Sequence, residues 1–148
     1  MSDNSRDPID LGPISMTFSV LAEDSGGTVT VGRCDVAAGA GVPIPHFHDE
    51  FEETIYGLEG TTTFTVDGRE IAIGPGDTYC IRRGAVHSFE AGDVDAAFLA
   101  IVTPGVLGPE YFFEIRDAVI AGGENGPDPQ AIGEVMVRHG LTPVSPGG

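Results

Sequence analysis

Glycine and proline interrupt this chain at short intervals, and that punctuation limits what it can fold into. The 148 residues include 22 glycines and 11 prolines. Between residues 54 and 102, the apolar and β-branched runs are short and are separated by turn sequences. One of these, Asp67-Gly68, is a strong signal for a two-residue hairpin. The pattern favours many short strands and few long helices, as in a closed barrel or a sandwich.

Most of the strands can be assigned from this pattern of runs and turns. The stretch 37–45 (AAGAGVPIP) is predicted to be an extended loop that leads into His46. Residues 1–13 are predicted to form a flexible lead-in, and residues 14–103 the barrel. Strands are expected over 14–36 (with a turn at 24–27), 54–58, 61–66, 69–73, 78–81, 85–90 and 94–102.

The character of the chain changes at Pro104. Gly108-Pro109 and Asp128-Pro129 each resemble the start of a helix, with proline at the first helical position. Gly122-Gly123 and Gly140 supply the corresponding stops. We therefore expect a helical tail over 104–148 that packs on the outside of the barrel, within a single domain.

The charge of the chain excludes several classes of function. The net charge is −16, and all seven basic residues are arginine. The absence of lysine excludes Schiff-base chemistry on a lysine and the usual phosphate-binding loop. Such a negative field repels nucleic acids and anionic membranes, so neither is expected as a partner. No stretch approaches membrane-spanning length and no signal peptide is evident, which predicts a cytoplasmic protein.

Two cysteines, Cys34 and Cys80, lie in apolar segments without metal-type spacing. A lone pair of this kind is weak evidence for a disulfide framework. Both are therefore predicted to be reduced residues in or near the core.

Three of the four histidines lie in two clusters, each beside a turn pattern. His46 and His48 are two residues apart, so on an extended strand they face the same side. A bend after His48 would bring Glu53 to the same point. His87 follows the turn at 82–84, and a hairpin-rich barrel can fold it back onto the first cluster.

Three imidazoles and one carboxylate inside a barrel suit a first-row divalent metal. Fe(II), Mn(II), Ni(II), Co(II) and Zn(II) all accept such ligands, and one or two coordination positions would stay open for substrate. Glu50 and Glu52 are alternatives for the carboxylate, although the distance to Gly60 favours Glu53. His139, near a predicted helix C-terminus, is expected to be structural.

These residues resemble the two motifs of the cupin superfamily. The stretch 46–60, HFHDEFEETIYGLEG, is similar to the first motif, and the stretch 76–87, GDTYCIRRGAVH, is similar to the second. The likeness extends over roughly residues 30–103 as a strand pattern. It implies an all-β fold, the cupin β-barrel (a double-stranded β-helix, or jelly roll), with a short C-terminal helical extension. It also implies a homodimer.

The resemblance implies a metal held by four ligands: His46, His48, Glu53 and His87. The leading hypothesis is a quercetinase-like, metal-dependent dioxygenase that acts on a small enol or aromatic substrate, with Glu53 as a catalytic base. The alternatives are a non-catalytic cupin that binds a small ligand or a metal, and a cupin isomerase, decarboxylase or lyase. Possible substrate contacts are Arg82, Phe47, Tyr79 and Phe89.

Overall fold

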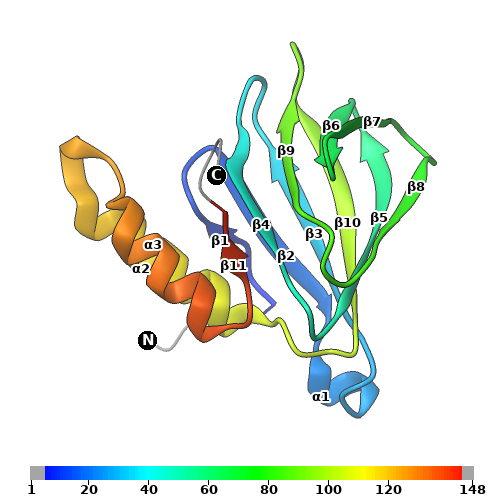
Figure 1. Cartoon of the computed structure of the whole chain (residues 1–148), viewed down its shortest axis with the longest axis horizontal. Helices are drawn as coiled ribbons and strands as arrows, with labels where there is room; N and C mark the ends of the chain where they lie inside the picture. Colours follow the sequence, from blue (N-terminus) through cyan, green and yellow to red (C-terminus); the bar gives the residue numbers. More distant parts are fainter. Residues whose placement is uncertain (1–5, 145–148) are drawn as a thin grey trace.

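Two antiparallel sheets face one another in this protein (Figure 1). The structure, a computed structural model, describes residues 6–144. Sheet A has six strands in the spatial order β1 (Ile9–Asp10), β2 (Ile14–Val20), β3 (Thr30–Val36), β10 (Ala96–Thr103), β5 (Glu52–Glu59) and β8 (Thr78–Ile81). Sheet B has five strands in the order β11 (Thr142–Pro143), β4 (Gly41–Phe47), β9 (His87–Ala91), β6 (Thr62–Val66) and β7 (Arg69–Ile73). The predicted all-β class is confirmed, and within residues 6–144 side chains of the two facing sheets meet between them.

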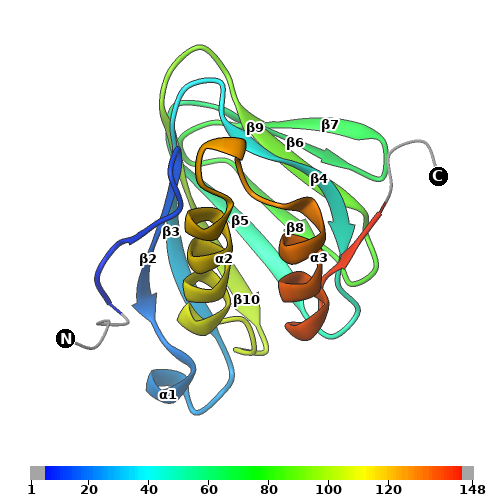
Figure 2. The ribbon, with the colours of Figure 1, turned by 90° about the vertical axis from the view of Figure 1, so that its left-hand side faces the viewer.

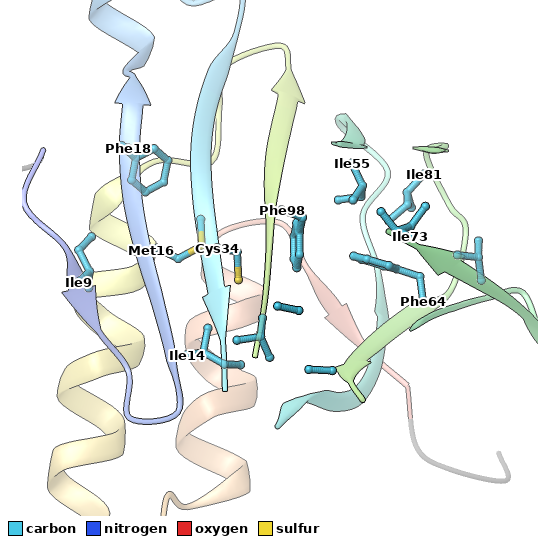
Figure 3. Close-up of a cluster of buried hydrophobic side chains, with 14 of the residues drawn as sticks. Ile9, Ile14, Met16, Phe18, Cys34, Ile55, Phe64, Ile73, Ile81 and Phe98 are labelled. Carbon is cyan, nitrogen blue, oxygen red and sulfur yellow. The ribbon is translucent and has the colours of Figure 1, made fainter. Parts of the chain in front are cut away.

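Burial alternates along the strands with the two-residue period expected for a sheet that has one buried face. In β3 the alternation is unbroken, from Thr30 through Cys34 to Val36. Figure 3 shows side chains from both sheets directed into the space between them. There Phe64 of β6 meets Phe98 of β10 edge to face, with ring centroids 5.2 Å apart. The core therefore lies between the sheets.

The hairpin predicted at Asp67-Gly68 is present between β6 and β7. Asp67 has φ 48° and Gly68 has φ 82°. This left-handed geometry matches the twist of the flanking strands.

The prediction of a loop over residues 37–45 is wrong for its second half, because β4 begins at Gly41. Prolines normally argue against a strand, since each lacks a backbone N–H donor. Here β4 pairs with β9 irregularly, with a register shift between Val42 and His46. The carbonyl of Pro45 accepts a hydrogen bond from Val144 on the other side. The strand thus forms with fewer donors than a regular one.

Other differences concern the lead-in and one cysteine. Residues 1–5 of the predicted lead-in lie outside the described part of the chain. Within the remainder, Ile9 is 1% exposed and β1 pairs with β2. Cys34 is buried as predicted, but Cys80 is exposed, so its assignment to the core is wrong. Cys80 lies on a short strand where alternate residues face outwards.

The helical tail begins and ends at the predicted signals. Helix α2 spans Pro109–Gly122 and α3 spans Pro129–Arg138, joined by the 3₁₀ turn Gly123–Asn125. Asp128 caps α3 by accepting a hydrogen bond from the backbone of Gln130. A four-residue helix, α1 (Ala22–Ser25), links β2 to β3.

Helices α2 and α3 lie side by side over one side of the two sheets (Figure 2). On the sheet A side, Phe112 of α2 contacts Phe18 of β2, with ring centroids 5.7 Å apart. On the sheet B side, α3 lies next to β11. No helix within residues 6–144 is long and apolar enough to cross a membrane.

Candidate metal centre and its cavity

Strands from both sheets bring the predicted ligands together. His46 lies in β4 and His87 opens β9, both in sheet B, whereas Glu53 lies in β5 of sheet A. The Nε2 atom of His48 is 3.5 Å from Oε1 of Glu53, and that of His87 is 3.9 Å from the same oxygen. His48, Glu53 and His87 each offer one donor atom, and these three atoms lie within 4.8 Å of one another. The three residues are therefore positioned to hold a metal ion.

Backbone carbonyls fix the orientation of each imidazole. Nδ1 of His48 is 2.9 Å from the carbonyl oxygen of Phe51, and Nδ1 of His87 is 2.8 Å from that of Ala85. A carbonyl oxygen can only accept, so Nδ1 carries the proton and Nε2 keeps its lone pair. Metal-binding histidines in proteins are commonly oriented by such a contact.

The buried Nε2 atoms of His48 and His87 have no hydrogen-bond partner among the described residues. His48 is 1% exposed and His87 is 3% exposed. Among the described residues, neither Nε2 atom has a hydrogen-bond partner. A buried polar atom without a partner costs about 1–3 kcal/mol. Two imidazole nitrogens and one carboxylate oxygen are a good donor set for a first-row divalent metal, and a metal would satisfy both nitrogens.

His46 stands beside this group of three. Its ring centroid is 4.4 Å from that of His87 and 6.4 Å from that of His48. Its Nδ1 donates to the carbonyl of Ile44 at 3.1 Å, as for the other two histidines. Its donor atoms are outside the group that meets within 4.8 Å. The structure thus brings three of the four predicted ligands together and places the fourth next to them.

Burial favours the neutral form of His46 and His87, the form that binds a metal. Burial, and next the neighbouring His87, lower the pKa of His46 to about 4. Burial also lowers the pKa of His87. For Glu53, burial acts to raise the pKa, but the contact with His48 and the nearby imidazoles outweigh it, so the pKa lies below its usual value. At neutral pH, His46 and His87 therefore present neutral imidazoles and Glu53 presents a carboxylate.

Glu52, one of the two alternatives for the carboxylate, is engaged elsewhere. It accepts from Nε of Arg83 at 2.5 Å and from the hydroxyl of Thr103 at 3.1 Å. Glu50 is exposed. Of the three glutamates, Glu53 is the one whose carboxylate lies beside the histidines.

The two motifs are tied together through the main chain. The N–H of Gly84, in the turn before β9, donates to the carbonyl of His48 at 2.9 Å. Gly84 has φ 81°, in the left-handed region that glycine adopts without strain. One residue before His87, the N–H of Val86 donates to the side chain of Asp67 at 2.9 Å. The Asp67-Gly68 hairpin therefore helps to place His87.

A cavity of about 190 Å³ adjoins the site. An engineered cavity of about 150 Å³ holds benzene, so this one can accept a small organic molecule. His46 and Glu53 line one part of it, and both helices of the tail line another. The lining is Leu11, Ile14, Met16, Phe18, Thr30, Gly32, Cys34, Val42, Ile44, His46, Glu53, Phe89, Phe98, Ala100, Val102, Leu107, Tyr111, Phe112, Ile115, Ile132, Met136 and Leu141.

Of the possible substrate contacts predicted from the sequence, only Phe89 lines this cavity. Arg82 is exposed at the turn before β9. Tyr79 packs against the core between the sheets. Phe47 alternates with His46 along β4 and pairs with Thr142 of β11.

The tail supplies a wall of the cavity, which sequence reasoning missed. From the sequence, the helices were expected on the outside of the barrel, with no role in the site. Phe51 was also missed: its ring stacks on His48 with centroids 4.0 Å apart. The signal available for Phe51 was its place between the two ligands His48 and Glu53. His139, predicted to be structural, contacts Glu114 through Nε2 at 2.5 Å, away from the metal centre.

Comparisons with known proteins agree with this geometry. Residues 32–102 match a family model described as a cupin domain. A quercetin 2,3-dioxygenase of Bacillus subtilis (strain 168) is 32% identical over 68 residues, which are 46% of this chain and 20% of that protein. The chain thus matches only a fifth of its curated relative.

Solved structures extend the likeness. A predicted oxalate decarboxylase of Thermotoga maritima is 25% identical with a TM-score of 0.60, over 70% of this chain and 99% of that one. An ectoine synthase of P. lautus is 18% identical with a TM-score of 0.61, over 95% of this chain and 82% of that one. The match to the ectoine synthase shows the fold alone. It covers 95% of this chain and therefore includes most of the helical tail.

Proposed function

This chain belongs to the cupin superfamily, and we propose that it is a metal-dependent dioxygenase acting on a small enol or aromatic molecule. One observation carries the proposal: two buried imidazole nitrogens without partners meet a carboxylate beside an apolar cavity. We assign the metal to His48, Glu53 and His87, with His46 as a fourth ligand. His46 and Glu53 line the cavity next to the site, so a substrate in the cavity would reach the metal from that side.

The role of each residue follows from its surroundings. A divalent metal at this site would supply a Lewis acid and, if redox-active, a partner for dioxygen. Glu53, which lines the cavity and stays ionised at neutral pH, would accept the proton of a substrate hydroxyl. The imidazoles of His46 and His87 stay neutral, and those of all three histidines are oriented by their Nδ1 contacts. The apolar walls exclude water from the reacting group.

The choice of dioxygenase among cupin reactions rests on two supports. The curated relative is a quercetin 2,3-dioxygenase, although it matches over 46% of this chain. The cavity is lined mainly by aliphatic and aromatic side chains, and none of the arginines lines it. Such walls favour an apolar substrate over a small dianion.

Oxygen consumption tests this proposal. The chain would be loaded anaerobically with Fe(II), Mn(II), Ni(II), Co(II) or Zn(II), mixed with a panel of enols and catechols, and then exposed to oxygen. We expect metal-dependent oxygen uptake with at least one substrate, lost in Glu53→Gln and retained in Glu70→Gln, which makes the same change at an exposed glutamate of β7. No uptake with any metal or substrate would contradict the proposal.

Decarboxylase chemistry is a second candidate because a predicted oxalate decarboxylase matches over 99% of its length. The same panel separates the two. Carbon dioxide release from a carboxylic acid substrate without oxygen uptake would favour the decarboxylase. Tight binding of a ligand that is recovered unchanged would instead indicate a non-catalytic binding protein.

A further inference from the structure

Tyr111 of α2 is a buried hydrogen-bonding group that the metal centre does not use. Its side chain is 8% exposed and lines the cavity. Its hydroxyl makes no hydrogen bond with any group in residues 6–144. Within residues 6–144 the hydroxyl oxygen is not among the fully enclosed atoms that lack a partner. It is therefore accessible, and a ligand in the cavity that Tyr111 lines can accept its hydrogen bond.

The ring of Tyr111 is held in place on both sides. Its centroid is 4.9 Å from that of Phe112 and 5.3 Å from that of His139, both edge to face. His139 is itself fixed by its contact with Glu114. The hydroxyl therefore has a defined position and loses little conformational entropy when it binds a ligand.

The rest of the cavity offers little polar recognition. The hydroxyl of Thr30 already donates to the carbonyl of Leu107 at 3.0 Å. The thiol of Cys34 is a weak donor. Among the described residues of the lining, Glu53 is the only acidic one and none is arginine. An anionic group placed away from the metal centre would therefore be buried without a countercharge, which is costly.

We propose that Tyr111 donates a hydrogen bond to an oxygen acceptor of the substrate, and that the cavity selects uncharged, mainly apolar or aromatic molecules that carry such an acceptor. This deepens the proposed function, since it concerns the substrate of the same cavity. It needs only the cavity and Tyr111, so it can be tested without metal or turnover.

Tyr111 stays a donor over the working pH range. Burial, followed by the negative charge of Glu53, raises the pKa of the phenol above its ordinary value. The hydroxyl is therefore protonated at neutral pH and remains available to an acceptor.

Binding of three matched probes tests the proposal on the full-length chain after treatment with a chelator. Acetophenone carries a carbonyl acceptor, α-methylstyrene has nearly the same shape without it, and benzoate replaces it with a charge. Affinities would be measured by ligand-observed NMR titration for the wild type, Tyr111→Phe and the control Tyr56→Phe, which alters an exposed tyrosine.

We expect the wild type and Tyr56→Phe to bind acetophenone roughly three- to tenfold more tightly than α-methylstyrene, the span of one net hydrogen bond. Tyr111→Phe should lose this preference while keeping its affinity for α-methylstyrene. Benzoate should bind most weakly. Equal binding of acetophenone and α-methylstyrene by the wild type, a preference retained in Tyr111→Phe, tight benzoate binding, or no binding of acetophenone would each overturn the proposal.

Infrared spectroscopy gives a second readout that does not depend on the folding of a variant. The carbonyl stretch of ¹³C-labelled acetophenone bound to the wild type should lie below its frequency in hexane, as a donated hydrogen bond requires. A frequency equal to that in hexane would overturn the proposal. These results are separable from the proposed function: the probe preference can hold in a chain that takes up no oxygen, and oxygen uptake can occur without it.

Discussion

The metal end and the helical end of the cavity are built in different ways. The metal end comes from a short part of the chain, residues 46–87, and its imidazoles are oriented by hydrogen bonds to nearby backbone carbonyls. The helical end comes from residues 107–141 and is held by side-chain packing. Backbone contacts fix direction, whereas packing fixes shape. The first suits ligands that must meet at a point, and the second suits a wall that selects a substrate.

Phe51 joins the two ends. Its ring stacks on His48, and its carbonyl accepts from Nδ1 of the same histidine. The same side chain, 1% exposed, belongs to the apolar cluster that contains Leu107, Tyr111 and Met136 of the tail region. Phe51 is therefore the residue whose loss should affect both ends of the cavity at once.

Phe51→Ala should lower both stability and metal affinity. Removing a buried phenylalanine costs about 3–5 kcal/mol in free energy of unfolding. Loss of the stacked ring should also free His48 to turn, which weakens metal binding roughly 10- to 100-fold, as for other groups that orient a ligand. Denaturant unfolding and metal titration would measure the two effects.

Phe64→Ala is the matched control for Phe51→Ala. Phe64 is also 1% exposed but lies between the sheets, away from His48. It should lose similar stability and keep its metal affinity. If both variants bind metal equally well, Phe51 does not orient His48.

Acid should destabilise the metal-free chain through the metal end. His46 has a pKa of about 4 in the folded chain, below its ordinary value of 6.5, so the unfolded chain takes up a proton first. This contribution is complete above about pH 6.5 and is lost as the pH falls towards 4, a change of up to about 3 kcal/mol. Urea unfolding between pH 7 and 4.5 would measure it.

His46→Gln tests the origin of that slope. The variant should show a shallower loss of stability over the same pH range, because the titrating group is gone. His139→Gln, which alters the tail, should keep most of the wild-type slope. An unchanged slope in His46→Gln would show that other groups cause the acid sensitivity.

Asp128→Ala should destabilise helix α3 without affecting the metal centre. Asp128 caps α3, and loss of such a cap costs about 1 kcal/mol. Thermal unfolding should detect this loss, whereas the metal content should stay at the wild-type value. A fall in metal content would contradict this, because it would show that metal binding depends on the stability of helix α3.

The sequence predicted the metal end better than the helical end for physical reasons. Ligands such as His46 and His48 share a strand face because of the two-residue period, and turn residues mark where the chain folds back. These are local rules. The same rules missed β4, because the prolines in the stretch 37–45 argue against a strand while a register shift accommodates them.

Tyr111 illustrates what local rules cannot give. Its helix was predicted from Gly108-Pro109, but a tyrosine in a helix carries no sign of which cavity it will line. That depends on where α2 docks, which is decided by packing against residues such as Phe18 that lie far away in the sequence. Arg82 shows the converse, since its place beside the second motif suggested a substrate contact, yet it is exposed and outside the cavity lining.

The metal content of untagged protein tests the central claim most directly. Elemental analysis would compare the wild type with the double variant His48→Ala, His87→Ala and with the control His139→Ala. The account predicts about one divalent metal ion per chain in the wild type and the control, and almost none in the double variant. A wild type that stays empty after reconstitution with each candidate metal, or a double variant that retains its metal, would contradict it.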